Sequence, residues 1–305
     1  MKILVVEDSA VDRFKVEGYL KSWGLDYTAV GSGTTALRLL EDANPPNMAL
    51  LDWVLPGVDG IELCRRIRSL GTNGAYIYTV MLTAKNRKQD LLTAMEAGAD
   101  DYLSKPVNAS ELRARIQVGM RILDLQQSLR FAATHDFLTN LLNRPEILDA
   151  LEREFSRSGR EGKPVAVILA DLDHFKQVND SMGHPAGDIV LKEVAHRLKS
   201  DLRPYDLAGR YGGEEFLLIL PGCDLSAGMR RANEIRDRVA RDGISTPFGT
   251  SFVTVSMGVT VTSFNPNETI VDVLRQADTA LYTAKKNGRN RVEPFLACHG
   301  RGAGS

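Results

Sequence analysis

The sequence predicts an α/β protein with two domains, an N-terminal doubly wound parallel sheet and a C-terminal α+β domain. The chain has 305 residues, which fits two domains of roughly 150 residues each. In the first part of the chain, short apolar runs alternate with helix-length amphipathic segments, as in a parallel sheet covered on both faces. In the second part, strand patterns and a Gly-Gly hairpin signal are mixed with helices, which is typical of an α+β sheet.

Five apolar runs predict the strands of the N-terminal domain, which we assign to residues 1–120. They are Ile3–Val6, Tyr27–Val30, Met48–Leu51, Tyr78–Leu82 and Tyr102–Leu103. The predicted helices between them are Ala10–Trp23, Thr34–Asp42, Gly60–Ser69 and Lys88–Ala97. Five strands separated by helices predict a five-stranded parallel sheet.

A long helix is predicted to follow the first domain, because Asn108 and Glu111 resemble a capping box. Apolar residues then recur with 4-3-4-3 spacing at Val118, Ile122, Leu125, Leu129 and Ala132. This seam of about two heptads has two interpretations. It either covers the first domain, or it forms a helical connector and dimerisation stem over residues 121–133, which we prefer.

The C-terminal domain is assigned to residues 134–297, followed by a tail at 298–305 that we expect to be disordered. Strict alternation from Val253 to Val261 predicts a half-buried strand. The other predicted strands are Val165–Ala170, Leu207–Tyr211, Phe216–Leu220 and Arg291–Glu293, and the predicted helices are Asp188–Asp201, Leu225–Arg241 and Ile270–Lys286.

Charge and composition exclude several classes of function. The net charge is −1, with 38 basic and 39 acidic residues, which gives no support for a broad nucleic-acid or anionic-membrane surface. Cys64, Cys223 and Cys298 lie far apart, so neither a zinc site nor a disulfide framework is expected. No apolar run approaches the ~20 residues of a membrane span, and carboxylates follow the N-terminus too soon for a signal peptide. We therefore expect a cytoplasmic protein without membrane insertion.

Polar residues follow the predicted strands of the first domain. Glu7 and Asp8 follow the first strand, Asp52 the third, Thr83 the fourth and Lys105 the fifth. The carboxyl ends of parallel strands are where open α/β sheets bind ligands. Three clustered carboxylates fit a hard cation such as Mg²⁺, and the lysine and hydroxyl fit a phosphoryl group. Asp52 is the carboxylate that we expect to accept that group as an aspartyl-phosphate.

Residues 1–120 resemble a response-regulator receiver domain, which has a flavodoxin-like fold. The resemblance rests on Glu7-Asp8, on Asp52 with Pro56-Gly57 and Gly60, on Met81-Leu82-Thr83-Ala84, on Gly98-Ala99-Asp100-Asp101-Tyr102 and on Lys105-Pro106. It implies one Mg²⁺ held by Glu7, Asp8, Asp52 and the Trp53 carbonyl. It also implies that a histidine kinase or phosphotransfer protein phosphorylates Asp52. Thr83 and Lys105 would sense the phosphate, with Tyr102 either an aromatic switch or a core residue.

A second group of carboxylates lies in the C-terminal domain. Asp171 follows a predicted strand, and Gly212-Gly213 precede Glu214 and Glu215 on the hairpin. The glycines permit positive φ and a close approach by a phosphate, and the carboxylates suit Mg²⁺. Lys176, Lys285 and Arg289 are basic residues that could meet the same phosphates. Taken alone, the hairpin motif would more often be an ordinary surface turn.

Residues 134–297 resemble the GGDEF family of diguanylate cyclases, whose domain has a mixed sheet like that of nucleotide cyclases. The matching segments are Asp136-Phe137-Leu138-Thr139-Asn140-Leu141 with Asn143-Arg144, Asp171-Leu172-Asp173-His174-Phe175-Lys176, Asn179-Asp180, Gly183-His184, Gly187-Asp188, Arg210-Tyr211-Gly212-Gly213-Glu214-Glu215-Phe216, Ala277-Asp278, Ala280-Leu281-Tyr282, Ala284-Lys285 and Gly288-Arg289-Asn290. The third position of the family motif takes Asp or Glu, so Glu214 is a permitted variant.

The resemblance implies that two GTP molecules condense to cyclic di-GMP with release of two pyrophosphates, which requires a homodimer. Two Mg²⁺ ions, with Mn²⁺ as an alternative, would be held by Asp171, the Leu172 carbonyl, Glu214 and Glu215. Glu214 and Lys176 would act in catalysis. The other implied GTP contacts are Asn179 and Asp188 for guanine, and Gly212, Gly213, Lys285 and Arg289 for the phosphates.

Arg203 and Asp206 form an RxxD motif at the offset before Gly212 that the family uses to bind its product. The resemblance implies an inhibitory site for cyclic di-GMP, and the alternative is a surface ion pair. Two other functions remain to be weighed: a catalytically inactive cyclic di-GMP receptor, and a DNA-binding response regulator. The intact carboxylate set argues against the first, and the equal numbers of basic and acidic residues after position 120 argue against the second.

Overall fold

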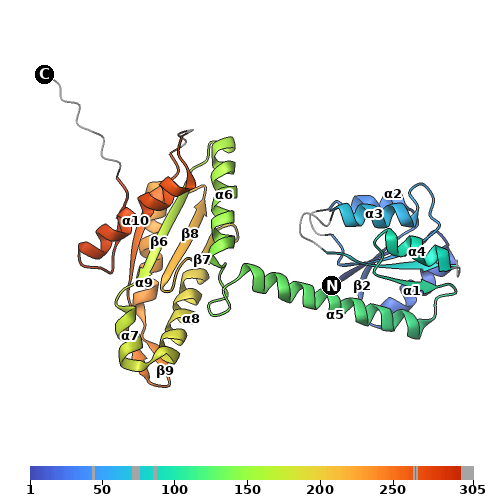
Figure 1. Cartoon of the computed structure of the whole chain (residues 1–305), viewed down its shortest axis with the longest axis horizontal. Coiled ribbons are helices and arrows are strands. Elements are labelled where there is room, and N and C mark those ends of the chain that lie inside the picture. Colours follow the sequence, from blue (N-terminus) through green and yellow to red (C-terminus); the bar gives the residue numbers. More distant parts are fainter. Residues whose placement is uncertain (43–44, 71–75, 85–87, 264, 266, 297–305) are drawn as a thin grey trace. The chain divides into compact units, whose positions relative to one another are not determined.

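The computed structural model describes residues 1–42, 45–70, 76–84, 88–263, 265 and 267–296 (Figure 1). Contacts divide the chain into two units, Met1–Arg130 and Phe131–Ser305, and each unit has its own buried core. The predicted tail at 298–305 lies outside the described residues. None of the helices in the described ranges combines the length and the apolar character that a membrane crossing needs.

The first unit is a five-stranded, all-parallel sheet, as predicted, and its strands lie in the order β2-β1-β3-β4-β5. Two apolar clusters cover its opposite faces, one containing Leu4 and Leu51 and the other containing Ile3 and Leu50. Neighbouring strand residues therefore point into different cores, which explains the continuous apolar runs. The elements are β1 (Lys2–Val6), α1 (Ala10–Ser22), β2 (Asp26–Val30), α2 (Gly33–Leu40), β3 (Met48–Asp52), α3 (Gly60–Leu70), β4 (Tyr78–Thr83), α4 (Lys88–Glu96) and β5 (Asp101–Ser104).

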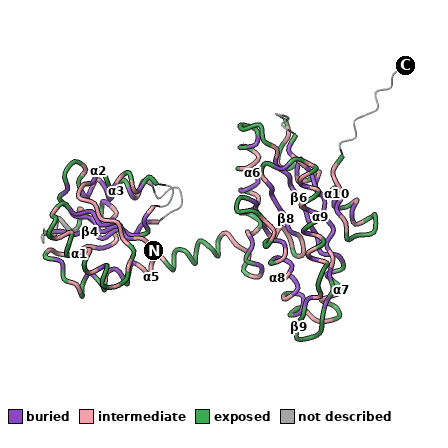
Figure 2. The backbone as a smooth tube through the Cα atoms, turned by 180° about the vertical axis from the view of Figure 1, so that it is seen from behind, coloured by how far each residue is buried: buried purple, intermediate pink, exposed green. Residues whose placement is uncertain are grey.

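Helix α5 (Ala109–Thr134) begins after Asn108, whose side chain accepts hydrogen bonds from the Ser110 and Glu111 N–H groups. Leu112, Ile116 and Gly119 are buried on the first unit. Further along, the helix surface is largely exposed (Figure 2).

The residues of the predicted seam along α5 differ in their burial. Ile122 packs against the core of the first unit, whereas the side chains of Val118, Leu125 and Leu129 are exposed. Covering the first unit therefore accounts for only part of the seam. The dimerisation stem stays a prediction.

The second unit contains a mixed sheet in the order β12-β11-β6-β8-β7, in which only the β11–β12 pair is parallel. Helices α9 and α10 pack on it, and a separate two-stranded sheet joins β9 and β10 (Figure 1). The elements are α6 (Arg144–Glu161), β6 (Val165–Leu172), α7 (Phe175–Met182), α8 (His184–Ser200), β7 (Leu207–Arg210), β8 (Glu215–Pro221), α9 (Leu225–Arg241), β9 (Ile244–Thr246), β10 (Gly249–Ser251), β11 (Val255–Val261), α10 (Ile270–Lys286) and β12 (Val292–Pro294).

Strand β11 corrects one expectation, because it is buried on both faces rather than half-buried. Val255, Met257 and Val259 lie in the larger core of the unit, as their alternation predicts. The residues between them are small, and two of them meet α10: Gly258 lies against its backbone, and the Thr260 hydroxyl donates to Gln276. A Cβ on Gly258 would lie 2.2 Å from the Ala277 carbonyl oxygen, so glycine permits this close helix contact. The alternation in β11 therefore distinguishes two buried faces, one with large apolar side chains and one with small residues, rather than a buried face and a solvent-exposed face.

Candidate active and regulatory sites

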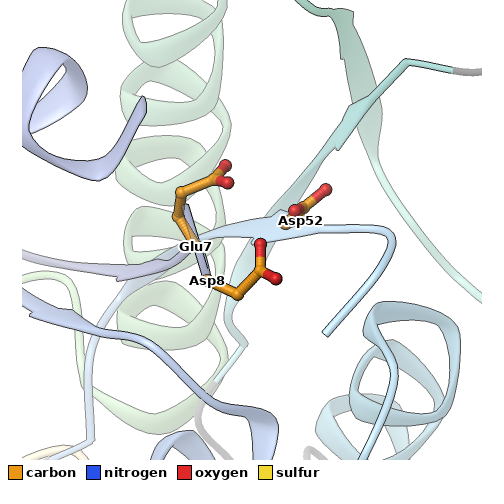
Figure 3. Close-up of side chains that lie close together, drawn as sticks. All are labelled: Glu7, Asp8 and Asp52. Atoms are coloured by element: carbon orange, nitrogen blue, oxygen red, sulfur yellow. The ribbon is translucent and has the colours of Figure 1, made fainter. Parts of the chain in front are cut away.

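The acidic residues of the first unit meet at the carboxyl ends of β1 and β3. Glu7 is completely buried, Asp52 is 5% exposed and Asp8 is exposed. One carboxylate oxygen from each lies within 4.8 Å of those of the other two (Figure 3). Among the acidic, histidine and cysteine side chains in the described ranges, this is the one group of three or more that gathers so closely.

Lys105 at the end of β5 neutralises only part of this negative charge. Its Nζ lies 2.7 Å from Glu7 and 2.8 Å from Asp52. Burial, together with the charge of Asp52, raises the pKa of Glu7 to about 7, although the hydrogen bond from Lys105 opposes the shift. Three carboxylates around one ammonium leave a surplus of negative charge and of oxygen ligands. The donor set therefore fits a hard divalent cation.

The other predicted residues of the first unit lie on β4, on β5 or directly after β3. Thr83 is buried, and its carbonyl accepts a hydrogen bond from the Lys105 N–H. The Trp53 carbonyl accepts one from the Gly60 N–H. Tyr102 is half-buried and packs against the core that contains Met81. This packing is compatible with both interpretations of Tyr102.

The second site combines a strand end, a hairpin and a helix of the second unit. Asp171 on β6 is mostly buried, and its Oδ2 lies 2.9 Å from the Nζ of Lys285 on α10. Burial raises the pKa of Asp171 above its usual range, and the ammonium of Lys285 opposes the shift. The pKa of Glu214 is also raised, first by burial and then by the charge of Asp171. The two carboxylates therefore share one electrostatic environment next to a lysine.

The two hairpin glycines correct another expectation, because neither has a positive φ. A Cβ on Gly212 would lie 2.4 Å from a carboxylate oxygen of Glu215, while Gly213 has open space beside it. The small size of Gly212, rather than a left-handed backbone, lets the Glu215 carboxylate lie against this turn. The hairpin itself is confirmed, since β7 and β8 pair antiparallel around it.

The predicted guanine residues lie on α7 and α8, which are joined at Gly183. The Asn179 side chain is pressed against α8, where a Cβ on Gly187 would lie 2.0 Å from its Oδ1. Asp188 is exposed in α8, and Lys176 is exposed in the first turn of α7. The structure thus places an amide, a carboxylate and an ammonium on one pair of packed helices.

The RxxD residues form a tight turn before β7. The Asp206 carboxylate accepts a hydrogen bond from the Arg203 backbone N–H, at 2.9 Å, rather than pairing with the guanidinium. The guanidinium instead contacts the hydroxyl of Tyr205. Asp206 is 8% exposed, and its Oδ1 accepts no hydrogen bond from the described residues. Both motif residues line a cavity of about 320 Å³ that also contains Lys199, so a polar ligand could reach them.

One link in this unit does not follow from the sequence motifs. Arg210 donates to the Gly213 carbonyl, at 2.7 Å, and to both oxygens of Asp136. Asp136 also accepts from the N–H and hydroxyl of Thr139. The chain after α5 is therefore tied to the glycine hairpin. The signal available in the sequence was a pair of opposite charges, Asp136 before Thr139 and Arg210 before the Gly-Gly hairpin.

Comparison with known proteins identifies the family. A family model described as "Response regulator receiver domain" matches residues 3–117. A second, described as "Diguanylate cyclase, GGDEF domain", matches residues 133–291, more than half of the chain. The chain belongs to the GGDEF family. It is a GGDEF protein with a receiver domain ahead of the family domain.

Individual relatives of this GGDEF protein support the assignment. It is 32% identical to the response regulator PleD of Caulobacter vibrioides over 301 residues, which is 95% of the chain and 65% of PleD. It thus spans less than two thirds of that relative. It is 36% identical to the diguanylate cyclase DosC of Escherichia coli over 53% of the chain and 35% of DosC. The coiled coil and GGDEF domain of DgcB from Caulobacter crescentus, in complex with c-di-GMP, superposes with a TM-score of 0.55 at 33% identity, covering 61% of this chain and 97% of that one.

The link from Asp136 to the GGDEF hairpin predicts a pH-dependent contribution to stability. Although burial opposes it, hydrogen bonds from Thr139 and the charge of Arg210 hold the pKa of Asp136 below its usual value. Asp136→Asn should therefore destabilise the second unit by about 1–2 kcal/mol at pH 7. The difference from wild type should begin to shrink as pH falls below ~4, where the carboxylate of the unfolded state takes up a proton, and should disappear below the lower pKa of the folded state.

Urea unfolding followed by circular dichroism measures this difference. The two tryptophans, Trp23 and Trp53, both lie in the first unit, so their fluorescence reports that unit separately. It should give the same midpoint in the variant and the wild type. Equal stability of the second unit at pH 7 would contradict the prediction.

Proposed function

We propose that this protein is a phosphorylation-regulated diguanylate cyclase that condenses two GTP molecules to cyclic di-GMP and two pyrophosphates. The observation that carries the proposal is the meeting of Asp171, Lys285 and the hairpin Glu214 at one edge of the GGDEF sheet. A carboxylate pair beside a lysine, next to open space at Gly213, suits a metal-bound triphosphate. Membership of the family supports the same reaction.

In the proposed reaction, the 3′-oxygen of one GTP attacks the α-phosphorus of the other. The new O–P bond replaces the bond to the bridging oxygen, and pyrophosphate leaves with that electron pair. Glu214 is the proposed acceptor of the 3′-hydroxyl proton, and exposed Lys176 is proposed to stabilise charge in the transition state. The step occurs twice, once in each direction, so two domains must face each other.

The remaining predicted residues hold the substrate. We propose that Asn179 and Asp188 hydrogen-bond guanine, and that Lys285 and Arg289 bind the phosphates. Asp171, Glu214, Glu215 and the Leu172 carbonyl are proposed to hold two Mg²⁺ ions, with Mn²⁺ as an alternative. Bound metal would neutralise charge on the phosphates and the leaving group. We propose that the protein works in the cytoplasm, because the proposed reaction uses GTP as its substrate.

Regulation is proposed to begin at Asp52. A phosphoryl group from a histidine kinase or phosphotransfer protein would compete with Glu7 for Lys105, while one Mg²⁺ is held by Glu7, Asp8, Asp52 and the Trp53 carbonyl. Thr83 and Tyr102 would respond to the phosphate. The exposed residues of the α5 seam would then take part in the homodimer that brings two GTP sites together.

The deciding experiment incubates purified protein with GTP and Mg²⁺, with and without beryllofluoride. We expect cyclic di-GMP and pyrophosphate in a 1:2 ratio, more of both with beryllofluoride, and no product from ATP. No product under activating conditions would overturn the proposal. Binding of cyclic di-GMP without turnover would instead support the receptor function.

Product inhibition is proposed to act at Arg203 and Asp206, because a buried oxygen of Asp206 accepts no hydrogen bond from any described residue and lies in a cavity that Lys199 and Arg203 line. Arg203→Ala should raise the cyclic di-GMP concentration needed for half-inhibition at least tenfold, as expected for loss of a charged hydrogen bond (~1.4 kcal/mol). Initial-rate assays with added product measure this. Arg241→Ala, at the exposed end of α9, is the matched control. Unchanged inhibition in Arg203→Ala would leave the motif a structural turn.

A further inference from the structure

The turn that carries Arg289 is held in an unusual backbone conformation. Between α10 and β12, Gly288, Arg289 and Asn290 have φ values of 112°, 62° and 45°. Two of the three are not glycine, and left-handed φ is unfavourable at such residues because the Cβ crowds the backbone. This conformation persists only if the surrounding structure holds it.

Asp173, which directly follows β6, supplies that support. Its Oδ2 accepts the Asn290 N–H at 3.0 Å, across 117 positions in the sequence. The same carboxylate accepts the hydroxyls of Thr254 and Ser256, each at 2.7 Å. It is 5% exposed, and its own N–H donates to the Thr254 carbonyl, so both ends of the residue are fixed.

The position of this turn matters because it places Arg289 beside the end of α10, which carries Lys285. The Arg289 N–H donates to the carbonyl of Ala284, the residue before Lys285, at 3.1 Å. Lys285 reaches Asp171 directly from the last turn of α10. Arg289 comes after the helix has ended, and its direction therefore depends on the turn rather than on helical geometry.

We propose that Asp173 is a positioning residue that holds the Gly288–Asn290 turn and thereby directs Arg289 at the triphosphate of the substrate. The inference rests on the proposed function, since it takes Arg289 as a phosphate ligand. Asp173 stands two residues from Asp171, and an Asp-Leu-Asp segment would also fit a metal site in which both carboxylates are ligands. However, the Asp173 carboxylate already accepts three hydrogen bonds from within the protein, from Thr254, Ser256 and Asn290. Its oxygens are therefore engaged by protein donors.

The two roles differ in what asparagine should do. An amide oxygen can replace Oδ2 and accept both the Asn290 N–H and the Thr254 hydroxyl. The amide nitrogen can then donate to the Ser256 hydroxyl, which rotates to accept. Asp173→Asn therefore keeps all three contacts and should bind GTP like wild type. If Asp173 were a metal ligand, Asp173→Asn would lose metal-dependent GTP binding as Asp173→Ala does.

Calorimetric binding of GTP and of pyrophosphate in Mg²⁺ tests the proposal without relying on turnover. Asp173→Ala should weaken both by about tenfold, while Asp173→Asn stays within about twofold of wild type. In the Arg289→Ala background, Asp173→Ala should add no further loss, because its effect passes through Arg289. Equal losses in both backgrounds, or equal losses in the Asn and Ala variants, would overturn the proposal.

Hydrogen exchange on the wild-type protein provides a measurement that needs no variant. The Asn290 amide should be protected at neutral pH, and exchange at the rate of an unstructured peptide would overturn the proposed hydrogen bond. Failure of the wild type to bind GTP or pyrophosphate would overturn the proposed function and this inference with it. Normal binding by wild type and by Asp173→Ala would overturn the inference alone.

Discussion

Glu214→Gln is expected to abolish cyclic di-GMP formation while leaving the protein folded. Glu214 lies on the hairpin beside Asp171, in surroundings that already raise its pKa through burial and through that neighbouring charge. Glutamine has nearly the same size but neither accepts a proton at neutral pH nor carries charge for a divalent cation. Removing such a group from a phosphoryl-transfer site lowers kcat by roughly a thousandfold or more.

The assay measures pyrophosphate release and cyclic di-GMP under saturating GTP, with a thermal melt of each protein. Glu234→Gln, on the exposed side of α9, is the matched control for the same chemical change. Its turnover should equal that of the wild type. If Glu214→Gln turns over GTP at a wild-type rate, Glu214 has no part in the mechanism.

Glu215→Gln separates the two adjacent glutamates. Glu215 opens β8 opposite Asp171 in the ladder, and its carboxylate lies over Gly212. The Glu215 carboxylate therefore packs against the hairpin itself. We expect a smaller loss of kcat than in Glu214→Gln, together with weaker Mg²⁺ binding, measured as a higher Mg²⁺ concentration at half-maximal activity. A larger loss would exchange the roles of the two residues.

The fold could be predicted from the sequence where the hydropathy pattern of a strand matches the burial of both of its faces. The parallel sheet of the first unit was recognisable because its runs are buried on both sides. The same burial misled for β11, whose second face consists of Ser256, Gly258 and Thr260. In a hydropathy pattern, such small residues resemble a solvent-exposed face. Here Gly258 instead allows the backbone of α10 to approach the strand closely.

The candidate sites could be predicted where residues follow strand ends, since topology alone brings such ends together. Asp52 and Glu7 are examples. The supporting contacts could not be predicted in this way. Asp136 reaches Arg210 across 74 positions, and Asp173 reaches Asn290 across 117. Such contacts depend on strand register and on turn geometry, which no local pattern encodes.

Asp52→Asn is expected to abolish activation by a phosphate mimic without unfolding the first unit. In the structure, the Lys105 ammonium bridges Asp52 and Glu7, at 2.8 and 2.7 Å. Phosphorylation would add about one further negative charge and three acceptor oxygens at Asp52, which changes the partner that Lys105 prefers. Asparagine offers no oxygen that can form the acyl phosphate or bind beryllofluoride.

Light scattering coupled to size exclusion, run beside the turnover assay, measures the response. In wild-type protein, beryllofluoride should raise both the dimer fraction and the rate of cyclic di-GMP formation, the latter at least tenfold, whereas neither should change in Asp52→Asn. Asp59→Asn is the matched control, because asparagine can still accept the Glu62 N–H that Asp59 caps. An equal response in Asp52→Asn would show that regulation does not pass through this aspartate, and the surplus of carboxylate around Lys105 would then serve a different ligand.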